Sequence, residues 1–285
     1  MRRLLAVFLT LLLSIGFAHA EEQVPVLPVM QLHMIDAGTA DAFLIMAGDT
    51  VILIDCGTDT DAHARPDDML NYLAQAGFDH VDAYFVTHYH NDHAGNLDLL
   101  MSLYGSDKTI IYGPSMQLPV RFLPLPAGEY RQLTDGQELT IGDFHITCVG
   151  PEQIQDGGET NRDSLNFVLS YGCHSFLFTG DYAHGSLAAR YPDLLKDIEV
   201  LKFPHHGLEP ILMFSKTIKL VRPKIVLVTG NATWPARKFI EGENYWKPDA
   251  YYGPYLGNVV LLFSPNDVKV HTDVAPGTFT MHSPE

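Results

Sequence analysis

Short apolar runs recur along the chain, and many are rich in β-branched residues, a pattern that favours strands. In the first half they predict strands at 31–35, 42–46, 51–54, 83–86 and 109–112. In the second half they predict strands at 138–141, 144–149, 164–171, 175–179, 199–203, 225–228, 259–263 and 268–272. The first three strands follow one another closely, so they form a meander before any helix intervenes.

Apolar residues at three- and four-residue spacing predict helices between these strands, at 66–76, 96–104, 185–195 and 210–220. Pro66 suits the first turn of a helix, and Gly77 suits its end. Strands that alternate with helices in both halves imply a layered α/β architecture. No repeat, low-complexity tract or long linker interrupts residues 21–285, so a single domain is expected there.

The first 20 residues form a pattern of their own. Arg2 and Arg3 precede an apolar run at 4–17, and the small residues Ala18 and Ala20 come just before an acidic pair. This arrangement is typical of a secretory signal peptide at 1–20. The run is short for a permanent membrane span, which needs about 20 apolar residues, although an uncleaved anchor is the alternative. We therefore expect an exported protein without a permanent span after cleavage.

Composition and charge narrow the function. The 285 residues are 46% hydrophobic, which is ample for a buried core, and they include 34 acidic against 18 basic residues. Loss of Arg2 and Arg3 with the signal peptide leaves 16 basic residues and a net charge of −18. Extended non-specific binding along nucleic acid is not expected, because it requires clusters of basic side chains. A polyanion held at one point by metal cations remains compatible with this charge.

The three cysteines are too few and too scattered for a disulfide framework or a zinc knuckle. Cys56, Cys148 and Cys173 each lie in an apolar, strand-like run. We interpret them as small buried core residues, with one disulfide in an exported protein as the alternative.

The segment 87–96 carries the densest chemistry. It follows the predicted strand at 83–86 and precedes the predicted helix at 96–104, and it contains His88, His90, Asp92 and His93. A loop between a strand and a helix can direct several ligands to one point. Imidazole nitrogens together with a carboxylate oxygen suit Zn²⁺ or Mn²⁺ and leave positions open for water.

The spacing His88-x-His90-x-Asp92-His93 after an apolar strand resembles the signature of the metallo-β-lactamase superfamily. The resemblance extends over about 31–272, and it implies a four-layer αβ/βα sandwich. It also implies a metal-dependent hydrolase that binds two zinc ions, with manganese as the alternative.

Three other elements of the same family, one before this motif and two after it, occur in the expected order. Asp55 lies in an Asp-x-Gly element, and the resemblance implies that it supports the metal-binding loop without being a ligand. Asp181 follows Gly180 in the element whose carboxylate bridges the two metals. One residue of the pair His205 and His206 completes the second metal position, and the sequence does not rank the two.

The segment 36–42, Asp-Ala-Gly-Thr-Ala-Asp-Ala, resembles an element of the metallo-β-lactamase domain of ComEC-type DNA-uptake proteins. The segment 161–165 and the sequence Pro-His-His-Gly at 204–207 match that subgroup too. Phosphorylcholine esterases of bacterial surfaces are similar. The resemblance therefore implies a bacterial protein, secreted, periplasmic or bound to the cell surface, that acts on a small-molecule or polymer phosphodiester.

The segment 149–164 departs from the family pattern. Most members have a histidine between the first motif and the Gly-Asp element, and this segment contains none. Asn161 and Asp163 stand where that ligand is expected, so either one coordinates or the first position has fewer ligands. His145 lies upstream on a predicted strand, where we expect it to point outward or to be packed.

A second departure follows the strand at 225–228, where the DNA-uptake relatives have a histidine that is missing here. The segment 241–256 is instead rich in aromatic residues: Tyr245, Trp246, Tyr251, Tyr252 and Tyr255. We interpret it as a packed hydrophobic loop. The alternative is an aromatic wall over the metal site that selects a choline-like cation or a base.

The resemblance implies a reaction in which a metal-activated hydroxide attacks the substrate. His88 and His90 are expected to hold one metal, while Asp92, His93 and one of His205 or His206 hold the other. Asp92 also orients the nucleophile, and Asn161 or Ser164 donates a hydrogen bond to the substrate. Hydrolysis of a lactam, lactone or thioester, and a non-catalytic metal-binding surface protein, are the competing hypotheses.

Overall fold

The computed structural model describes residues 27–58, 66–208, 211–230, 247–253, 256–265 and 267–273. Within these ranges the strands form two sheets. The first sheet has eight strands in the order β15-β14-β1-β2-β3-β4-β5-β6, and the second has seven in the order β13-β12-β11-β10-β9-β8-β7. The predicted signal peptide at 1–20 and the aromatic residues Tyr245, Trp246 and Tyr255 lie outside the described ranges.

The first sheet consists of β1 Met30–Met34, β2 Phe43–Ala47, β3 Thr50–Ile54, β4 Ala83–Phe85, β5 Ile110–Gly113, β6 Glu129–Gln132, β14 Val259–Ser264 and β15 Asp267–Thr272. The second consists of β7 Glu138–Ile141, β8 Phe144–Gly150, β9 Asn166–Tyr171, β10 His174–Phe178, β11 Val200–Lys202, β12 Ile225–Leu227 and β13 Ala250–Tyr252. The α-helices described are α1 Pro66–Gln75, α2 Asn91–Ala94, α3 Leu97–Tyr104, α4 Leu187–Arg190 and α5 Ile211–Val221.

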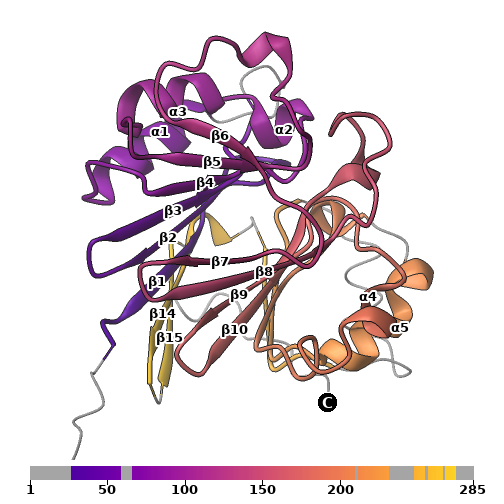
Figure 1. Ribbon diagram of the computed structural model, residues 1–285. Coiled ribbons are helices and arrows are strands. Elements are labelled where there is room, and N and C mark those ends of the chain that lie inside the picture. Colours follow the sequence, from indigo (N-terminus) through magenta and orange to yellow (C-terminus); the bar gives the residue numbers. More distant parts are fainter. Residues whose placement is uncertain are drawn as a thin grey trace, which may run out of the picture.

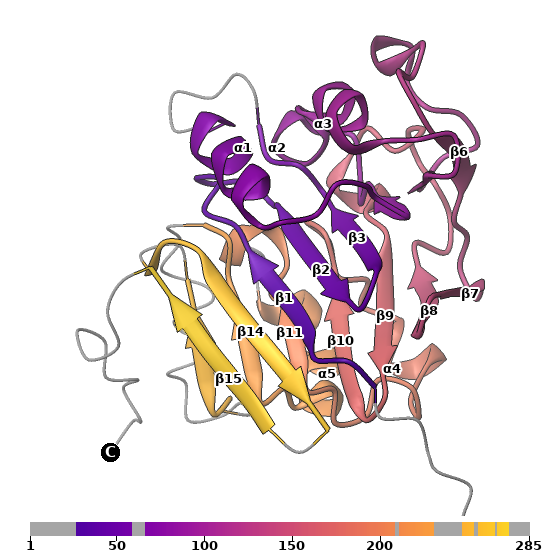
Figure 2. The same ribbon diagram turned by 90° about the vertical axis from the view of Figure 1, so that its left-hand side faces the viewer.

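The sheets and helices stack in four layers. Helices α1 and α3 cover the outer face of the first sheet, and α4 and α5 lie outside the second (Figure 1). Figure 2 shows β1 to β3 crossing in front of the second sheet, with β14 and β15 extending the first sheet at one side. Three separate clusters of buried apolar residues fill the spaces between the layers. The predicted four-layer αβ/βα sandwich is therefore confirmed.

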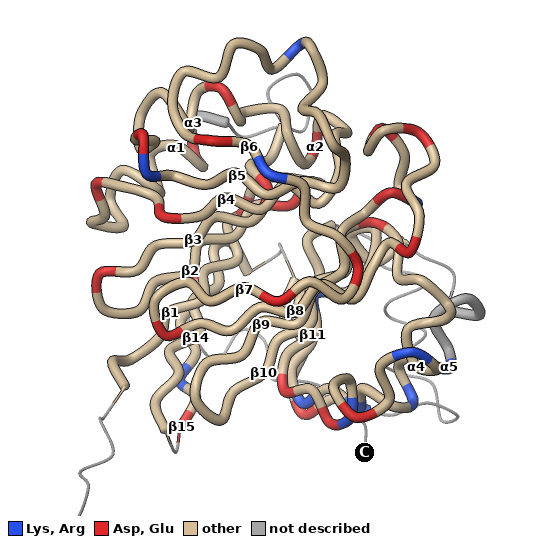
Figure 3. Tube along the Cα trace, viewed as in Figure 1, with Lys and Arg blue, Asp and Glu red and all other residues tan. Residues whose placement is uncertain are grey.

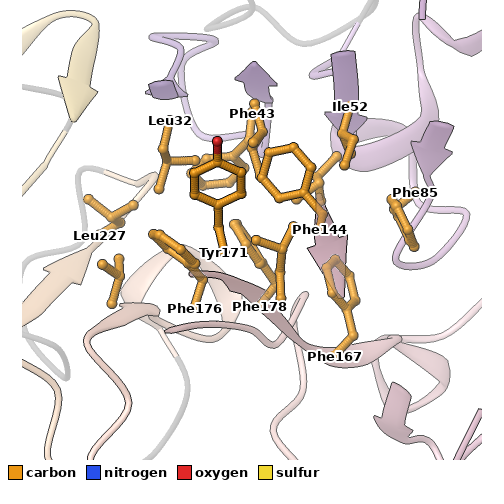
Figure 4. Packing of buried hydrophobic residues seen from close by; sticks show 14 of the residues in the cluster. Leu32, Phe43, Ile52, Phe85, Phe144, Phe167, Tyr171, Phe176, Phe178 and Leu227 are labelled. Atoms are coloured by element: carbon orange, nitrogen blue, oxygen red, sulfur yellow. The ribbon is translucent and has the colours of Figure 1, made fainter. Parts of the chain in front are cut away.

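The central cluster joins the two sheets through aromatic rings (Figure 4). Phe167 on β9 lies between Phe85 on β4 and Phe178 on β10, with ring centroids 4.9 and 5.3 Å away. Phe43 on β2 meets Phe178 edge to face at 5.5 Å. Such contacts add stabilisation to the burial of the rings themselves.

Strands β6 and β13 were not predicted from the sequence. Strand β6 is an edge strand with exposed Glu129 and Arg131, and its alternation of exposed and half-buried residues involves mainly polar side chains. Strand β13 lies in the segment that we interpreted as an aromatic loop; it places Tyr251 and Tyr252 on a strand beside β12.

The helix expected at 185–195 is much shorter. Helix α4 ends at Arg190, and Tyr191 leaves the helical conformation with φ −127° and ψ 53°. Pro192 explains this, because a proline disfavours the helical region for the residue before it.

The expectation for the cysteines holds for two of the three. Cys56 and Cys148 are buried free thiols, as predicted. Cys173 is exposed, which corrects the prediction, because it lies in the tight turn between β9 and β10 and not within a strand. His145 on β8 is exposed, as expected. Across the ranges that the structure describes, no helix combines the length and apolar character needed to traverse a bilayer.

Replacing Phe167 by Ala is expected to lower the free energy of unfolding by about 3–5 kcal/mol, because it opens a cavity between the two sheets. Urea denaturation followed by circular dichroism measures the change. Val120 is 84% exposed, so Val120→Ala serves as the control and should change stability by no more than about 0.5 kcal/mol. A loss below about 1 kcal/mol for Phe167→Ala would show that this ring does not join the sheets.

Candidate metal centre

The predicted site residues meet at one end of the two sheets, in loops that follow β3, β4, β10 and β11. These strands run parallel within each sheet, β3 beside β4 and β10 beside β11. Their carboxyl ends therefore lie at the same edge. The structure brings together side chains from both sheets: Asp55, His88, His90, Asp92, His93, Asp181, His205 and His206.

The loop after β4 gathers the first histidines. His88 and His93 are fully buried, and their ring centroids are 4.1 Å apart. His90 packs edge to face on His88 at 4.6 Å. The single turn of α2 begins after His90 and brings Asp92 and His93 back toward His88. Four closely spaced residues therefore share one small volume.

Asp181 lies among the histidines and presents its two oxygens to different groups. Its Oδ1 is 3.1 Å from His93 Nε2 and 3.4 Å from His206 Nε2. Its Oδ2 is 3.9 Å from His88 Nε2 and 3.7 Å from His205 Nε2. The carboxylate is almost completely buried. This position, between two sets of imidazole nitrogens, is the one expected for a bridging carboxylate.

The position of Asp181 depends on a close approach of three loops. Gly180 has a φ of +52°, and a Cβ there would lie 2.8 Å from Ser164 Cβ and 3.0 Å from Thr87 Cβ. Only glycine fits this position without displacing neighbours. The backbone N–H of Asp181 donates to Ser164 Oγ at 3.0 Å.

Ser164 itself is completely buried, and its hydroxyl lies 3.4 Å from His88 Nδ1. Ser164 therefore contacts the Nδ1 side of the His88 ring, opposite the Nε2 atom that faces Asp181. The expectation that it donates a hydrogen bond to the substrate has to be corrected, because this side chain has no access to solvent.

Asp55 supports the metal-binding loop, in the position that the resemblance implies. Its Oδ1 accepts a hydrogen bond from the Thr87 backbone N–H at 2.8 Å, and its Oδ2 accepts one from the Thr87 hydroxyl at 2.8 Å. His93 Nδ1 lies 2.8 Å from Asp55 Oδ2. A carboxylate at Nδ1 fixes the orientation of the ring and directs Nε2 into the site.

Asp41 orients the ring of His206 as Asp55 orients that of His93, and this role was not predicted from the sequence. Asp41 Oδ1 lies 3.1 Å from His206 Nδ1 and accepts a hydrogen bond from the Thr229 hydroxyl at 2.5 Å. Its other oxygen forms an ion pair with Lys202, whose Nζ also donates to the Gly180 carbonyl at 2.8 Å. A lysine in the otherwise apolar strand β11 was the available signal.

His205 and His206 both have left-handed backbone conformations, with φ of 51° and 50°. Non-glycine residues seldom adopt this conformation, and it costs of the order of 1–3 kcal/mol per residue. His206 is buried and its Nε2 lies 3.1 Å from Asp92 Oδ2. His205 is one-third exposed, and its Nε2 lies 3.2 Å from Asn161 Nδ2. The strained turn therefore places both rings at the site.

Asp163 takes no part in the site. Its carboxylate accepts hydrogen bonds from the backbone N–H groups of Gln155, Asp156 and Gly158, at 2.6, 3.0 and 3.1 Å, and from the Thr160 hydroxyl at 3.2 Å. These bonds hold the loop before β9 in shape. Of the two candidates for the place of the missing histidine, Asn161 and not Asp163 lies beside the other site residues.

The charges of the site follow from burial. Burial, together with the charge of His93, holds the pKa of His88 well below its usual range, so its ring is neutral. Burial acts to lower the pKa of His206, but the charges of Asp181 and Asp41 outweigh it and raise that pKa to about 9. The same competition raises the pKa of His93 well above its usual range. Without a metal, protonation of these two rings offsets part of the negative charge of the nearby carboxylates.

The donor set fits a divalent cation. Among the buried side-chain atoms that have no hydrogen-bond partner in the described part of the chain, four belong to this site: His88 Nε2, His93 Nε2, Asp181 Oδ1 and Asn161 Oδ1. Buried polar atoms are nearly always paired, so these atoms indicate ligands. Donors at about 2.0–2.2 Å from a tetrahedral zinc lie roughly 3.3–3.6 Å apart, which matches the contacts of 3.1–3.9 Å around Asp181.

A second arrangement has to be weighed. The donor atoms of Asp41, His93, Asp181 and His206 all lie within 4.8 Å of one another. Asp41, however, faces the Nδ1 atoms of both rings, at 3.6 Å from His93 and 3.1 Å from His206, and Lys202 already neutralises it. Asp92 and Asp181 face the Nε2 atoms. This geometry favours Asp92 and Asp181 as metal ligands and Asp41 as the residue that holds the rings.

Asp55→Asn is expected to weaken metal binding about 10- to 100-fold, because an amide cannot accept all three hydrogen bonds from Thr87 and His93. Competition between the protein and a chromogenic chelator for Zn²⁺ measures the affinity. Asp79 is exposed and lies away from these loops, so Asp79→Asn is the matched control. Equal affinities for the two variants would remove Asp55 from the support of the site.

Comparison with known proteins agrees with this geometry. A sequence profile described as "Metallo-beta-lactamase superfamily" matches residues 35–227. ComE operon protein 3 of Bacillus subtilis (strain 168) is 24% identical over 199 residues, which cover 62% of this chain but only 25% of that relative. The chain thus matches about a quarter of the length of this curated relative.

Solved structures share the fold at low identity. The metallo-beta-lactamase fold protein YhfI from Bacillus subtilis has a TM-score of 0.57 and 16% identity, covering 86% of this chain and all of that one. A mutant form of CmlA beta-hydroxylase has a TM-score of 0.57 and 11% identity, covering 82% of this chain and 54% of that one. The profile match, together with the metal-ligand geometry, identifies the chain as a member of the metallo-β-lactamase superfamily, within which it is a metal-dependent hydrolase.

Proposed function

We propose that the chain hydrolyses phosphodiester bonds with two divalent metal ions, zinc or manganese, held on either side of Asp181. The observation that carries this proposal is the division of the histidines between the two oxygens of that one carboxylate. Oδ1 faces His93 and His206, and Oδ2 faces His88 and His205. A pair of metals bridged in this way suits an in-line displacement at phosphorus.

Two divalent cations bound here would lower the pKa of a water molecule and neutralise charge on the phosphate oxygens. The protein's own contribution is to fix the ligands in place before substrate arrives. Asp55 and Asp41 hold His93 and His206 from behind, so the rings need not reorient during the reaction.

Asp92 connects the centre with solvent. Its side chain is one-third exposed, whereas that of Asp181 is buried. Partial burial acts to raise the pKa of Asp92, but the hydrogen bond from His206 and the charge of His93 lower it, so the carboxylate is ionised at neutral pH. We assign to Asp92 the orientation of the attacking water in addition to metal binding.

Two observations support phosphodiesters over carbonyl substrates. The segments 36–42 and 161–165 resemble ComEC-type proteins, and ComE operon protein 3 is a relative of this chain. The middle histidine of most superfamily members is also missing from 149–164. The substrate is then either small or a polymer engaged at one point, because acidic residues outnumber basic ones along the chain (Figure 3).

Hydrolysis of bis(p-nitrophenyl) phosphate tests the proposal. The purified protein, stripped of metal and then given Zn²⁺ or Mn²⁺, is expected to regain turnover. His90→Ala and Asp92→Ala should each lower the rate by about 100-fold or more, whereas His145→Ala, at an exposed position on β8, should leave it unchanged.

The other outcomes separate the competing hypotheses. Turnover of a lactam, lactone or thioester, with none of the phosphodiester, would contradict the proposed bond. Bound metal without turnover of either kind would indicate a metal-binding surface protein and not an enzyme.

We also propose that residues 1–20 direct export, on the basis of the charged, apolar and small-residue pattern described above. The exported chain should begin at Glu21 when its N-terminus is sequenced. Leu12→Arg, within the apolar run, should keep the chain inside the cell. A chain that is secreted with Met1 intact, or never exported in a bacterial host, would refute the signal peptide.

A further inference from the structure

One of the two metal positions lacks a protein ligand that most superfamily members have. His88 and His90 come from the loop after β4, and the usual third histidine is missing from 149–164. Asp163 cannot substitute, because four hydrogen bonds hold its carboxylate in the loop. The candidates for a further ligand are therefore Asn161 and residues from other parts of the chain.

The contacts of Asp181 show where a further ligand lies. Its Oδ2, the oxygen nearest His88, is 3.7 Å from His205 Nε2, slightly closer than the 3.9 Å to His88 Nε2. His206 instead approaches Oδ1, at 3.4 Å, in company with His93. Two consecutive histidines are thus directed to opposite oxygens of one carboxylate.

The backbone explains how neighbours in sequence reach the same site. In an extended strand, successive side chains point to opposite faces. At 205 and 206 the chain turns through two left-handed residues directly after Pro204, and the turn brings both rings to Asp181. Strain of this kind is kept mainly where a site requires the conformation. The same turn therefore makes both rings available to the two oxygens of Asp181.

We propose that the pair is divided between the metals: His206 binds the metal beside Asp92 and His93, and His205 replaces the missing histidine on the metal beside His88 and His90. This assignment rests on the proposed two-metal site. Asn161 lies beside His205, with Nδ2 3.2 Å from its Nε2 and Oδ1 buried without a partner. Imidazole is the stronger zinc ligand of the two, so Asn161 borders the metal while His205 binds it.

His205→Gly tests the assignment, because glycine favours the left-handed conformation and removes only the ring. Wild-type protein is expected to bind two Zn²⁺ per chain by isothermal titration and by elemental analysis. The variant should bind one, with affinity for the other lowered by about 100-fold or more. Its thermal unfolding without metal should occur at the same temperature as that of the wild type, or higher.

Further variants distinguish His205 from its neighbours. Asn161→Ala and His145→Ala should both keep two ions. With Mn²⁺, electron paramagnetic resonance should show a spin-coupled pair in these variants and an isolated ion in His205→Gly. Two ions in His205→Gly, or one ion in Asn161→Ala, would overturn the assignment, and so would a wild-type protein that never binds two. The ion count does not depend on turnover, so two ions without phosphodiester hydrolysis would contradict only the proposed function.

Discussion

The loops at this end of the molecule have to accommodate three buried carboxylates at the junction of the two sheets. These carboxylates belong to Asp41, Asp55 and Asp181. A buried charge is costly unless it is paired and hydrogen bonded. Asp55 meets this requirement through Thr87 and His93, and Asp41 meets it through Lys202, Thr229 and His206. Asp181 lies among four histidine rings, 3.1–3.9 Å from their Nε2 atoms, so its charge, like that of Asp92, is available to a metal ion.

Much of this arrangement could be predicted from local sequence. The central strands of the two sheets are apolar because both of their faces are covered, and the apolar runs located them. His88, His90, Asp92 and His93 lie within six consecutive residues, so their spacing alone indicates that their side chains meet at one site. Asp181 and the His205–His206 pair directly follow strands, and knowledge of the family supplied their roles before any contact was known.

Other parts could not be predicted, because they depend on contacts between distant segments. Asp41 and Lys202 are paired only after the two sheets pack, and a lysine in a buried strand indicates some acidic partner without naming it. The sequence also could not show that Ser164 faces the back of His88 or that Asp163 is bonded to its own loop. Two adjacent histidines look equivalent in sequence, and in the structure they differ in burial and in the oxygen of Asp181 that each ring approaches.

The division of the ligands between the two sheets has a consequence for how the protein acquires its metal. His88 to His93 belong to the first sheet, whereas Asp181 and the histidine pair belong to the second. No segment shorter than the span from His88 to His206 contains a complete site. Ions at the proposed site would therefore bind only after most of the chain has folded. Their identity would then depend on which ions are abundant in the compartment where folding occurs, as well as on the intrinsic preference of the ligands.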